Sequence, residues 1–162
     1  MSFLQNGNRF PAISAPKAGG GTLSLPGDLA GSFGVVLFYR GSWCPYCNAQ
    51  LSRFAGAKDR LTSVGIKVVA LSVDDEATTR GLIAKHKISF PMGYGADARA
   101  IAAATGAYLN EDPLYIQSTG FVLAPDGRWS TKSTRRGQSD ARWPRMWSAW
   151  FRTSSPRSKR KA

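Results

Sequence analysis

The sequence predicts an α/β protein with a central mixed sheet and helices on both faces. Two apolar runs rich in β-branched residues, 35–39 and 66–73, have the length and composition of strands buried on both sides. A helical pattern follows each run, which is the order of parallel crossovers. Segments 119–124 and 128–134 flank a Pro-Asp-Gly turn at 125–127 and are predicted to close the sheet as an antiparallel hairpin.

Weaker signals place the remaining elements around this sheet. The first 31 residues are rich in Gly, Pro, Ser and Asn and offer a short hairpin arm at 22–25. Apolar spacing predicts a helix from Pro45 to the glycine at position 65, and acidic residues mark the start of another over 74–87. The pattern is completed by an alanine-rich helix over 97–105, at best an edge strand over 89–92, and a loop over 107–118.

Length and composition indicate one folded domain. A chain of 162 residues, 43% of them hydrophobic, can bury a sizeable core. Two cysteines are too few for the disulfide framework of small secreted proteins. The first residues lack the basic and apolar regions of a signal peptide, and no apolar run approaches the roughly 20 residues of a spanning helix. We therefore expect a cytoplasmic protein.

The net charge of +12 is concentrated at the C-terminal end of the chain. Residues 1–127 contain 11 Lys and Arg against 9 Asp and Glu, whereas residues 128–162 contain 11 basic residues against one acid, Asp140. The body is close to neutral, so contact with nucleic acid or a membrane is expected, if at all, only from the tail. We predict a folded domain at 1–134 and a basic, Trp- and Arg-rich tail at 135–162.

Apolar side chains in the tail recur with helical spacing. They fall at i, i+3, i+4, i+7 and i+8 and form one stripe: Trp143, Met146, Trp147, Trp150 and Phe151. One interpretation is a terminal helix that packs against the sheet, and the other is a helix that docks on a membrane surface or a partner. The last segment, 153–162, is strongly basic and is predicted to be disordered.

The segment Cys44-Pro45-Tyr46-Cys47 carries the chemistry that the sequence indicates. Pro45 suits the first position of a helix, so Cys44 falls near the N-cap and Cys47 lies one turn later on the same face. The unpaired N–H groups and the dipole of a helix N-terminus lower the pKa of a thiol there and make it nucleophilic. The two sulfurs are within disulfide reach. The pair is therefore predicted to cycle between dithiol and disulfide.

A metal site and a static pair are the alternatives for these two cysteines. Structural zinc takes four ligands, and His86, which we expect on the surface, is the one other soft ligand available in the sequence. A static disulfide is unusual in a cytosolic protein. We therefore expect neither a metal nor another cofactor.

These motifs resemble the thioredoxin-like superfamily and, within it, the peroxiredoxins of the alkyl-hydroperoxide-reductase and thiol-specific-antioxidant type. Trp43-Cys44-Pro45-Tyr46-Cys47 is similar to the Trp-Cys-x-x-Cys of thioredoxins and the Cys-Pro-Tyr-Cys of glutaredoxins. The peroxiredoxin-like signal includes Val35–Tyr39, Val68–Asp74, Ile88–Pro91 and Gly120–Gly127. The resemblance extends to residue 134 and ends there.

The resemblance implies a thioredoxin-like three-layer fold and a thiol-dependent peroxidase that reduces hydrogen peroxide or organic hydroperoxides. Cys44 would be the attacking, peroxidatic thiolate. Cys47 would be the resolving thiol that converts the sulfenic acid of Cys44 into a disulfide. Thioredoxin, glutaredoxin or glutathione would then restore the dithiol.

Two positions depart from the family pattern. The threonine that precedes the peroxidatic cysteine by three residues is Gly41 here, and the arginine that helps to hold thiolate and peroxide is replaced by Ser118. Ser42, which we count with the cysteines as a candidate catalytic residue, either donates a hydrogen bond to the thiolate or peroxide or shapes the turn. Arg40 either supplies the missing positive charge or is solvated.

Two other functions are open on the sequence alone. The Cys-x-x-Cys spacing and the missing arginine also suit a thiol–disulfide oxidoreductase of thioredoxin or glutaredoxin character. The basic tail suits a degenerate redox domain that serves as a nucleic-acid-binding or membrane-binding module. Peroxide consumption, exchange with a mixed disulfide of glutathione, and retention on nucleic acid separate these three functions.

Overall fold

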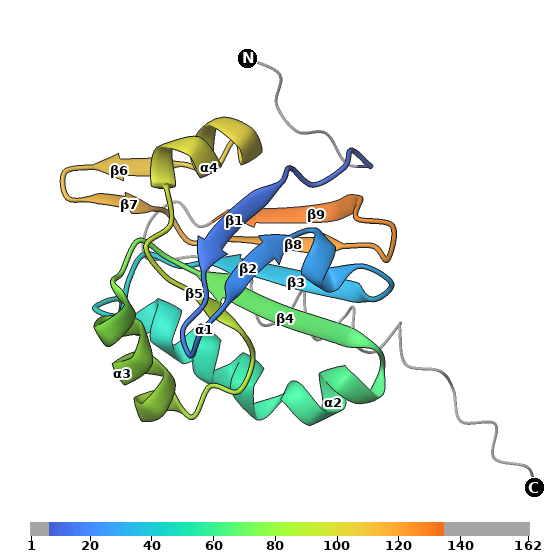
Figure 1. Cartoon of the computed structure of the whole chain (residues 1–162), viewed down its shortest axis with the longest axis horizontal. Coiled ribbons are helices and arrows are strands. Elements are labelled where there is room, and N and C mark those ends of the chain that lie inside the picture. Colours follow the sequence, from blue (N-terminus) through green and yellow to red (C-terminus); the bar gives the residue numbers. More distant parts are fainter. Residues whose placement is uncertain (1–6, 135–162) are drawn as a thin grey trace, which may run out of the picture.

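A five-stranded mixed sheet is the centre of the fold in the computed structural model, which describes residues 7–134 (Figure 1). The elements follow one another as β1 (Ile13–Pro16), β2 (Thr22–Leu25), β3 (Phe33–Phe38), α1 (Pro45–Gly56), α2 (Lys58–Ser63), β4 (Ile66–Leu71), α3 (Glu76–His86), β5 (Met92–Gly93), α4 (Ala98–Thr105), β6 (Leu109–Glu111), β7 (Leu114–Ile116), β8 (Thr119–Leu123) and β9 (Trp129–Thr134). A short 3-10 helix, Gly27–Leu29, lies between β2 and β3.

β3 lies at the middle of the sheet, whose strand order is β5-β4-β3-β8-β9. It runs parallel to β4, with Phe38 opposite Leu71, and antiparallel to β8, with Phe38 opposite Thr119. β9 completes an antiparallel hairpin with β8, and β5 is an edge strand parallel to β4. The predicted mixed sheet, with parallel strands first and a closing hairpin last, is confirmed.

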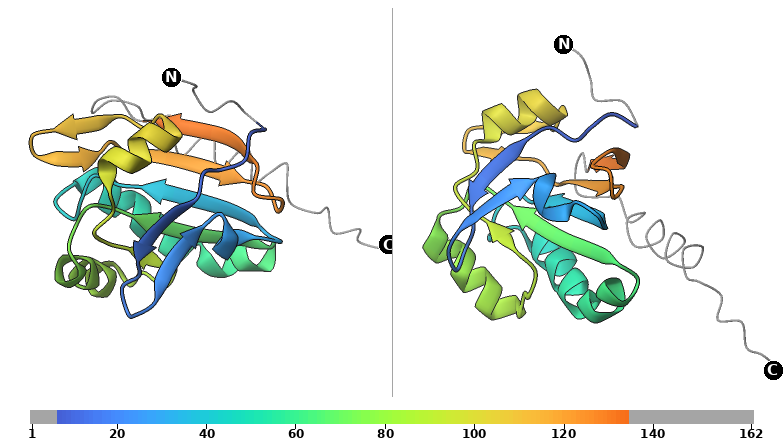
Figure 2. Two further views of the ribbon diagram at one scale, coloured as in Figure 1. Left: turned by 45° about the horizontal axis from the view of Figure 1, so that its top comes forward. Right: turned by 45° about the vertical axis from the view of Figure 1, so that its right-hand side comes forward.

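Alternate residues of β3 bury opposite faces of the sheet, as the two-residue period of a strand requires. Val35 and Leu37 belong to a core shared with apolar side chains of α1, α2 and α3. Val36 and Phe38 belong to a second core, shared with β1, β2 and α4. Figure 2 shows the same division in space, with α1, α2 and α3 on one side of the sheet and α4 with the β1–β2 hairpin on the other. Helices therefore cover both faces, as predicted.

The helix predicted from Pro45 to position 65 is in fact two helices. Ala57 ends α1 and begins α2. Gly56, a poor helix former, directly precedes the break. The apolar spacing continues across it, because Leu61 of α2 packs in the same core as α1, and this continuity concealed the interruption in the sequence.

Two short elements also differ from expectation. The loop predicted at 107–118 contains the β6–β7 hairpin, in which Leu109 pairs with Ile116. The edge strand predicted at 89–92 begins only after Pro91, at Met92. Strands of two or three residues are too short for an alternating pattern to register, so periodicity does not reveal them.

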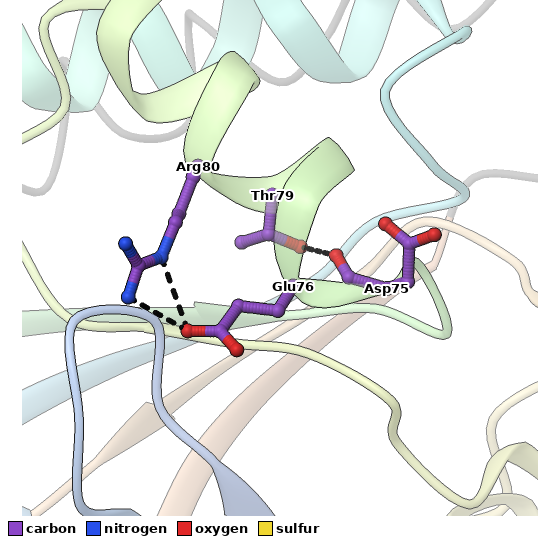
Figure 3. A network of polar contacts seen from close by, with 4 residues as sticks. All are labelled: Asp75, Glu76, Thr79 and Arg80. Atoms are coloured by element: carbon purple, nitrogen blue, oxygen red, sulfur yellow. Dashed lines mark hydrogen bonds and ion pairs between the residues drawn. The ribbon is translucent and has the colours of Figure 1, made fainter.

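The start of α3 shows how this sequence begins a helix (Figure 3). The Asp75 carboxylate accepts a hydrogen bond at 2.8 Å from the backbone N–H of Thr78, and the Thr79 hydroxyl donates at 2.8 Å to the Asp75 carbonyl. Glu76 and Arg80 form an ion pair at 2.9 Å one turn further along. The helix start predicted from the acidic residues at 74–76 is thereby confirmed.

The described residues end before the predicted tail. The proposed boundary after residue 134 and the apolar stripe from Trp143 to Phe151 both lie outside residues 7–134. None of the helices within 7–134 has the length and apolar character needed to cross a bilayer.

Candidate active site

The carboxyl end of β3 and the N-terminus of α1 bring the two cysteines together. Cys44 is the N-cap residue of α1, as predicted, and its sulfur accepts a hydrogen bond from the backbone N–H of Cys47, with 3.3 Å between sulfur and nitrogen. Pro45 lies in the first turn, where its missing N–H leaves no helical bond unmade. Both cysteines are free thiols, and Cys44 and Cys47 expose 3% and 2% of their surface.

The surroundings of the two thiols shift their pKa values in opposite directions. A hydrogen bond from the Cys47 thiol is the largest cause that lowers the pKa of Cys44, to about 6. Backbone N–H groups of Cys47 and Tyr46 and the charge of Arg40 act in the same direction, against burial, which raises the pKa. The same thiol–thiol bond, together with burial, holds the pKa of Cys47 far above its ordinary value. The hydrogen bond between the two sulfurs thus favours the thiolate form at Cys44 and the thiol form at Cys47.

Two polar side chains that the sequence pattern did not single out hold the loop before Cys44. The backbone N–H of Ser42 donates to Asp74 Oδ2 at 2.8 Å, and Asn48 Nδ2 donates to the Ser42 carbonyl at 2.8 Å. Asp74 follows β4, the parallel neighbour of β3, and the carboxyl ends of parallel strands meet at one edge of a sheet. The predicted pairing of these strands was therefore the signal that could have located Asp74.

Ser42 lies in this loop, and the two hydrogen bonds described above run through its backbone rather than its hydroxyl. One bond comes from Asp74, which follows β4, and the other comes from Asn48 of α1. The backbone N–H of Cys44 adds a third bond within the loop, to the Gly41 carbonyl at 3.2 Å. Of the two predicted roles for Ser42, this geometry supports the shaping of the turn.

A side chain at position 41 would collide with Trp43. An ideal Cβ on Gly41 would lie 2.5 Å from Trp43 Nε1, 2.9 Å from Trp43 Cδ1 and 3.2 Å from Asp74 Oδ1. Separations this short require the neighbouring atoms to move. The indole of Trp43 thus takes the space beside the backbone into which the threonine expected from the resemblance would project.

The place of the expected arginine holds a small uncharged side chain. Ser118 is 7% exposed and directly precedes β8, whose first residue, Thr119, pairs with Phe38 at the end of β3. Ser118 therefore lies at the edge of the sheet from which the cysteine loop emerges. Arg40 lies on that loop, is half-buried, and lowers the pKa of both thiols through its charge.

Exposed aromatic side chains stand on either side of Cys44 in the sequence. Trp43 exposes 57% of its surface and Tyr46 49%. The Trp43 ring packs edge to face against Tyr115 of β7, with 5.2 Å between ring centroids. The rim of the site is thus aromatic and open to solvent, whereas the sulfur of Cys44 is covered.

The histidine that was predicted to lie on the surface is half-buried between α1 and α3. Its Nδ1 lies 2.8 Å from Ser52 Oγ, within hydrogen-bonding distance. In the part of the chain that the structure describes, no group of three or more His, Cys, Asp or Glu side chains is placed to hold a metal ion. His86 therefore enters the packing of two helices rather than the cysteine site.

Sequence comparison places this chain beside the peroxiredoxins. The model of the AhpC/TSA family matches residues 6–128. Two curated relatives from Mycobacterium tuberculosis, one from strain CDC 1551 and one from strain H37Rv, both bear a peroxiredoxin name. Each is 31% identical over 132 residues, which cover 77% of this chain and 82% of the relative.

Comparison with solved structures supports the same fold. AhpC of Mycobacterium tuberculosis has a TM-score of 0.77 at 18% identity, with 95% of each chain covered. Peroxidoxin BcpB of the same organism also has a TM-score of 0.77 at 18% identity, over 94% of this chain and 99% of that one. A cysteine-to-serine mutant of peroxiredoxin 6 from Arenicola marina has a TM-score of 0.73 at 18% identity, over 94% and 76%. The thioredoxin-like fold expected from the resemblance is confirmed.

Proposed function

Because this chain belongs to the AhpC/TSA family, the family of the peroxiredoxins, we propose that it is a thiol-dependent peroxidase in which Cys44 attacks the hydroperoxide. The observation that carries the proposal is the sulfur of Cys44 at the N-cap of α1, where hydrogen bonds lower its pKa to about 6. At neutral pH most of this sulfur is thiolate, the form that acts as a nucleophile.

Attack by Cys44 transfers one oxygen atom to sulfur. The thiolate bonds to the terminal oxygen of the hydroperoxide and the O–O bond breaks. The leaving alkoxide or hydroxide takes up a proton and becomes an alcohol or water. Cys44 is oxidised by two electrons to a sulfenic acid, and the hydroperoxide is reduced by the same two electrons.

Cys47 then resolves the sulfenic acid. Its sulfur bonds to the sulfur of Cys44, and the hydroxyl leaves with the proton of the Cys47 thiol as water. Two equivalents of thiol, from thioredoxin, glutaredoxin or glutathione, reduce the resulting disulfide by exchange and are themselves oxidised to a disulfide. The hydrogen bond from the Cys47 thiol to the Cys44 sulfur supports this step, because it places the resolving group beside the atom that it must reach.

Ser42 has a positioning role in this proposal. Its backbone links β4 to α1 through Asp74 and Asn48 and so fixes the turn that presents Cys44 to the helix N-terminus. The hydroxyl is not required for either bond. A direct hydrogen bond from the Ser42 hydroxyl to bound peroxide is the alternative, and it predicts a much larger loss of activity when the hydroxyl is removed.

The burial of Cys44 favours a small substrate. With 3% of the residue exposed, hydrogen peroxide reaches the sulfur with less displacement of the loop than a bulky organic hydroperoxide needs. We therefore expect the second-order rate constant for hydrogen peroxide to exceed that for cumene hydroperoxide. A larger rate constant for cumene hydroperoxide would assign the exposed aromatic rim a role in substrate binding instead.

Peroxide consumption in the presence of a thiol reductant tests the proposed function. We expect sustained consumption with thioredoxin and thioredoxin reductase, or with glutathione and glutaredoxin, and none from a Cys44→Ser variant. A protein that leaves peroxide unchanged but reduces a mixed disulfide of glutathione would instead be a thiol–disulfide oxidoreductase. The reductant that supports turnover identifies the class of thiol that can serve as electron donor.

Location and tail function stay predictions from the sequence. A reducing compartment such as the cytoplasm suits a cysteine pair that must be returned to the dithiol after each turnover. Contact of residues 135–162 with nucleic acid or a membrane surface rests on their basic and aromatic composition.

A further inference from the structure

The backbone around Arg40 is tied to both cysteines. Arg40 follows the end of β3 by two residues, and its backbone N–H donates a hydrogen bond to the sulfur of Cys47. The carbonyl of the next residue, Gly41, accepts the backbone N–H of Cys44 at 3.2 Å. Any movement of this segment would therefore disturb the two sulfurs directly.

The side chain of Arg40 has no ion-pair partner among the described residues, and its Nε atom has no hydrogen-bond acceptor there. Arg80, Arg99 and Arg128 each pair with a carboxylate, whereas no ion pair among residues 7–134 includes Arg40. Its Nε atom is buried and has no hydrogen-bond acceptor within that range. Folded proteins rarely bury a charged donor without an acceptor, and a catalytic role is one of the explanations for such a donor.

The charge of Arg40 acts at the reaction centre. It lowers the pKa of both thiols, in addition to the larger effect that the Cys47 thiol has on Cys44. The position at which the family carries an arginine holds the buried, uncharged Ser118, so that position supplies no cation here. The cysteine loop therefore carries a half-buried cation, Arg40, while the position expected to carry one holds the uncharged Ser118.

On the basis of the proposed peroxidase function, we propose that Arg40 supplies, from the end of β3, the positive charge that the family places at position 118. Its guanidinium group holds the Cys44 thiolate and donates a hydrogen bond to the oxygen of the bound hydroperoxide. A planar group with several N–H donors suits two neighbouring acceptors. As negative charge moves from sulfur to the leaving oxygen, it stays beside the same cation, which stabilises the transition state.

Matched substitutions of two arginines test this role. Arg40→Gln removes the charge at the site, and Arg53→Gln removes the same charge from an exposed position on α1. The pH dependence of alkylation of Cys44 by iodoacetamide, located by mass spectrometry, gives its pKa. We expect Arg40→Gln to raise that pKa by about one unit. We also expect it to slow the reaction with hydrogen peroxide about tenfold at a pH where both proteins are fully thiolate. Arg53→Gln should match the wild type in both measurements.

Arg40→Lys separates the charge from the geometry of the guanidinium group and provides a second test if Arg40→Gln does not fold. We expect a pKa of Cys44 close to that of the wild type and a peroxide rate constant below it, because an ammonium group lacks the planar set of donors. Arg40→Gln with the properties of Arg53→Gln, or Arg40→Lys with wild-type values in both measurements, would overturn the proposal. Alkylation needs no peroxide, so a wild-type protein inert to peroxide would contradict the proposed function while the effect of Arg40 on the thiolate could still be read.

Discussion

Cys44 illustrates how one backbone position changes the chemistry of a side chain. A thiol in an ordinary setting has a pKa near 9.0 and is mostly protonated at neutral pH. At the N-cap of α1 the same thiol accepts hydrogen bonds from the Cys47 thiol and from two backbone N–H groups, and its pKa falls to about 6. The lowered pKa therefore results first from the Cys47 thiol and then from the backbone N–H groups at the start of the helix, without a separate catalytic base.

The first residue-scale prediction concerns pH. Because the pKa of Cys44 is lowered in the folded protein, its thiolate is present above about pH 6 and is lost as the pH falls through that value. The rate of alkylation should follow the same curve, with its midpoint at about 6 in the native protein and at about 9 in urea. Cys47→Ala removes the strongest donor and should raise the native midpoint. A native midpoint equal to that in urea would contradict the assignment.

The lowered pKa of Cys44 also makes the free energy of unfolding depend on pH. A thiol whose pKa is lower in the folded than in the unfolded state stabilises the fold fully above about pH 9, and this contribution is lost as the pH falls from 9 towards 6. The wild type in its dithiol form should therefore gain stability over Cys44→Ser as the pH rises through that window. Chemical denaturation at the two ends of the window measures the difference.

The second residue-scale prediction is that Gly41→Thr, which introduces the threonine expected from the resemblance, destabilises this protein. Its Cβ would lie 2.5 Å from Trp43 Nε1, so the indole must move. We expect a loss of about 1–3 kcal/mol in the free energy of unfolding and a change in tryptophan fluorescence. A second substitution, Trp43→Ala, should remove much of that loss. Gly56→Ala, at a helical position where an added Cβ meets no atom within 4 Å, is the control and should not destabilise.

At the scale of elements, the site is a junction of β3, β4 and α1. β3 carries the chain to the loop, Asp74 after β4 accepts from the Ser42 backbone, and Asn48 of α1 donates to the same residue. The loop is thus held from two sides before the helix begins. Both of these bonds run through the backbone of Ser42 rather than through its hydroxyl.

This junction gives the element-scale prediction. Asp74→Ala removes the acceptor of a hydrogen bond with a charged group and should cost about 1.5–3 kcal/mol of unfolding free energy. It should also slow the reaction of Cys44 with peroxide. Ser42→Ala keeps both backbone bonds and should leave both quantities near wild type. Asp59→Ala, an exposed acid on α2, is the matched control for loss of charge. A severe loss of activity in Ser42→Ala would show instead that the hydroxyl acts in the reaction.

For the whole molecule, residues 7–134 contain the two hydrophobic cores that lie on the two faces of the sheet. One core unites β3 with α1, α2 and α3, and the other unites it with β1, β2 and α4. A chain that ends at residue 134 should therefore fold, with the alkylation midpoint of Cys44 unchanged. Circular dichroism and a thermal melt measure this. A chain that fails to fold would show that the tail packs against the sheet, and loss of retention on nucleic acid with intact folding would assign the tail a separate binding role.

Much of this architecture could be predicted from the sequence because its signals are local and strong. The runs at 35–39 and 66–73 are long enough to define buried strands, and Pro45 between two cysteines marks a helix start. The β6–β7 hairpin and the break at Ala57 could not be predicted, since the first has only short strands and the second leaves the apolar spacing intact. Asp74 acquires its role from the Ser42 backbone, a neighbour distant in sequence that local patterns do not reveal. Arg40 lies close to both cysteines in the sequence, but its burial and its lack of a hydrogen-bond acceptor at Nε appear only in the structure.

The mass of the intact protein after treatment with one equivalent of hydrogen peroxide shows whether Cys44 is oxidised and whether Cys47 resolves the product. The wild type should lose two hydrogen atoms as Cys44 and Cys47 join, and Cys47→Ser should gain one oxygen atom on Cys44. Unchanged masses, or an oxygen atom located on Cys47 in a Cys44→Ser variant at the wild-type rate, would contradict this mechanism.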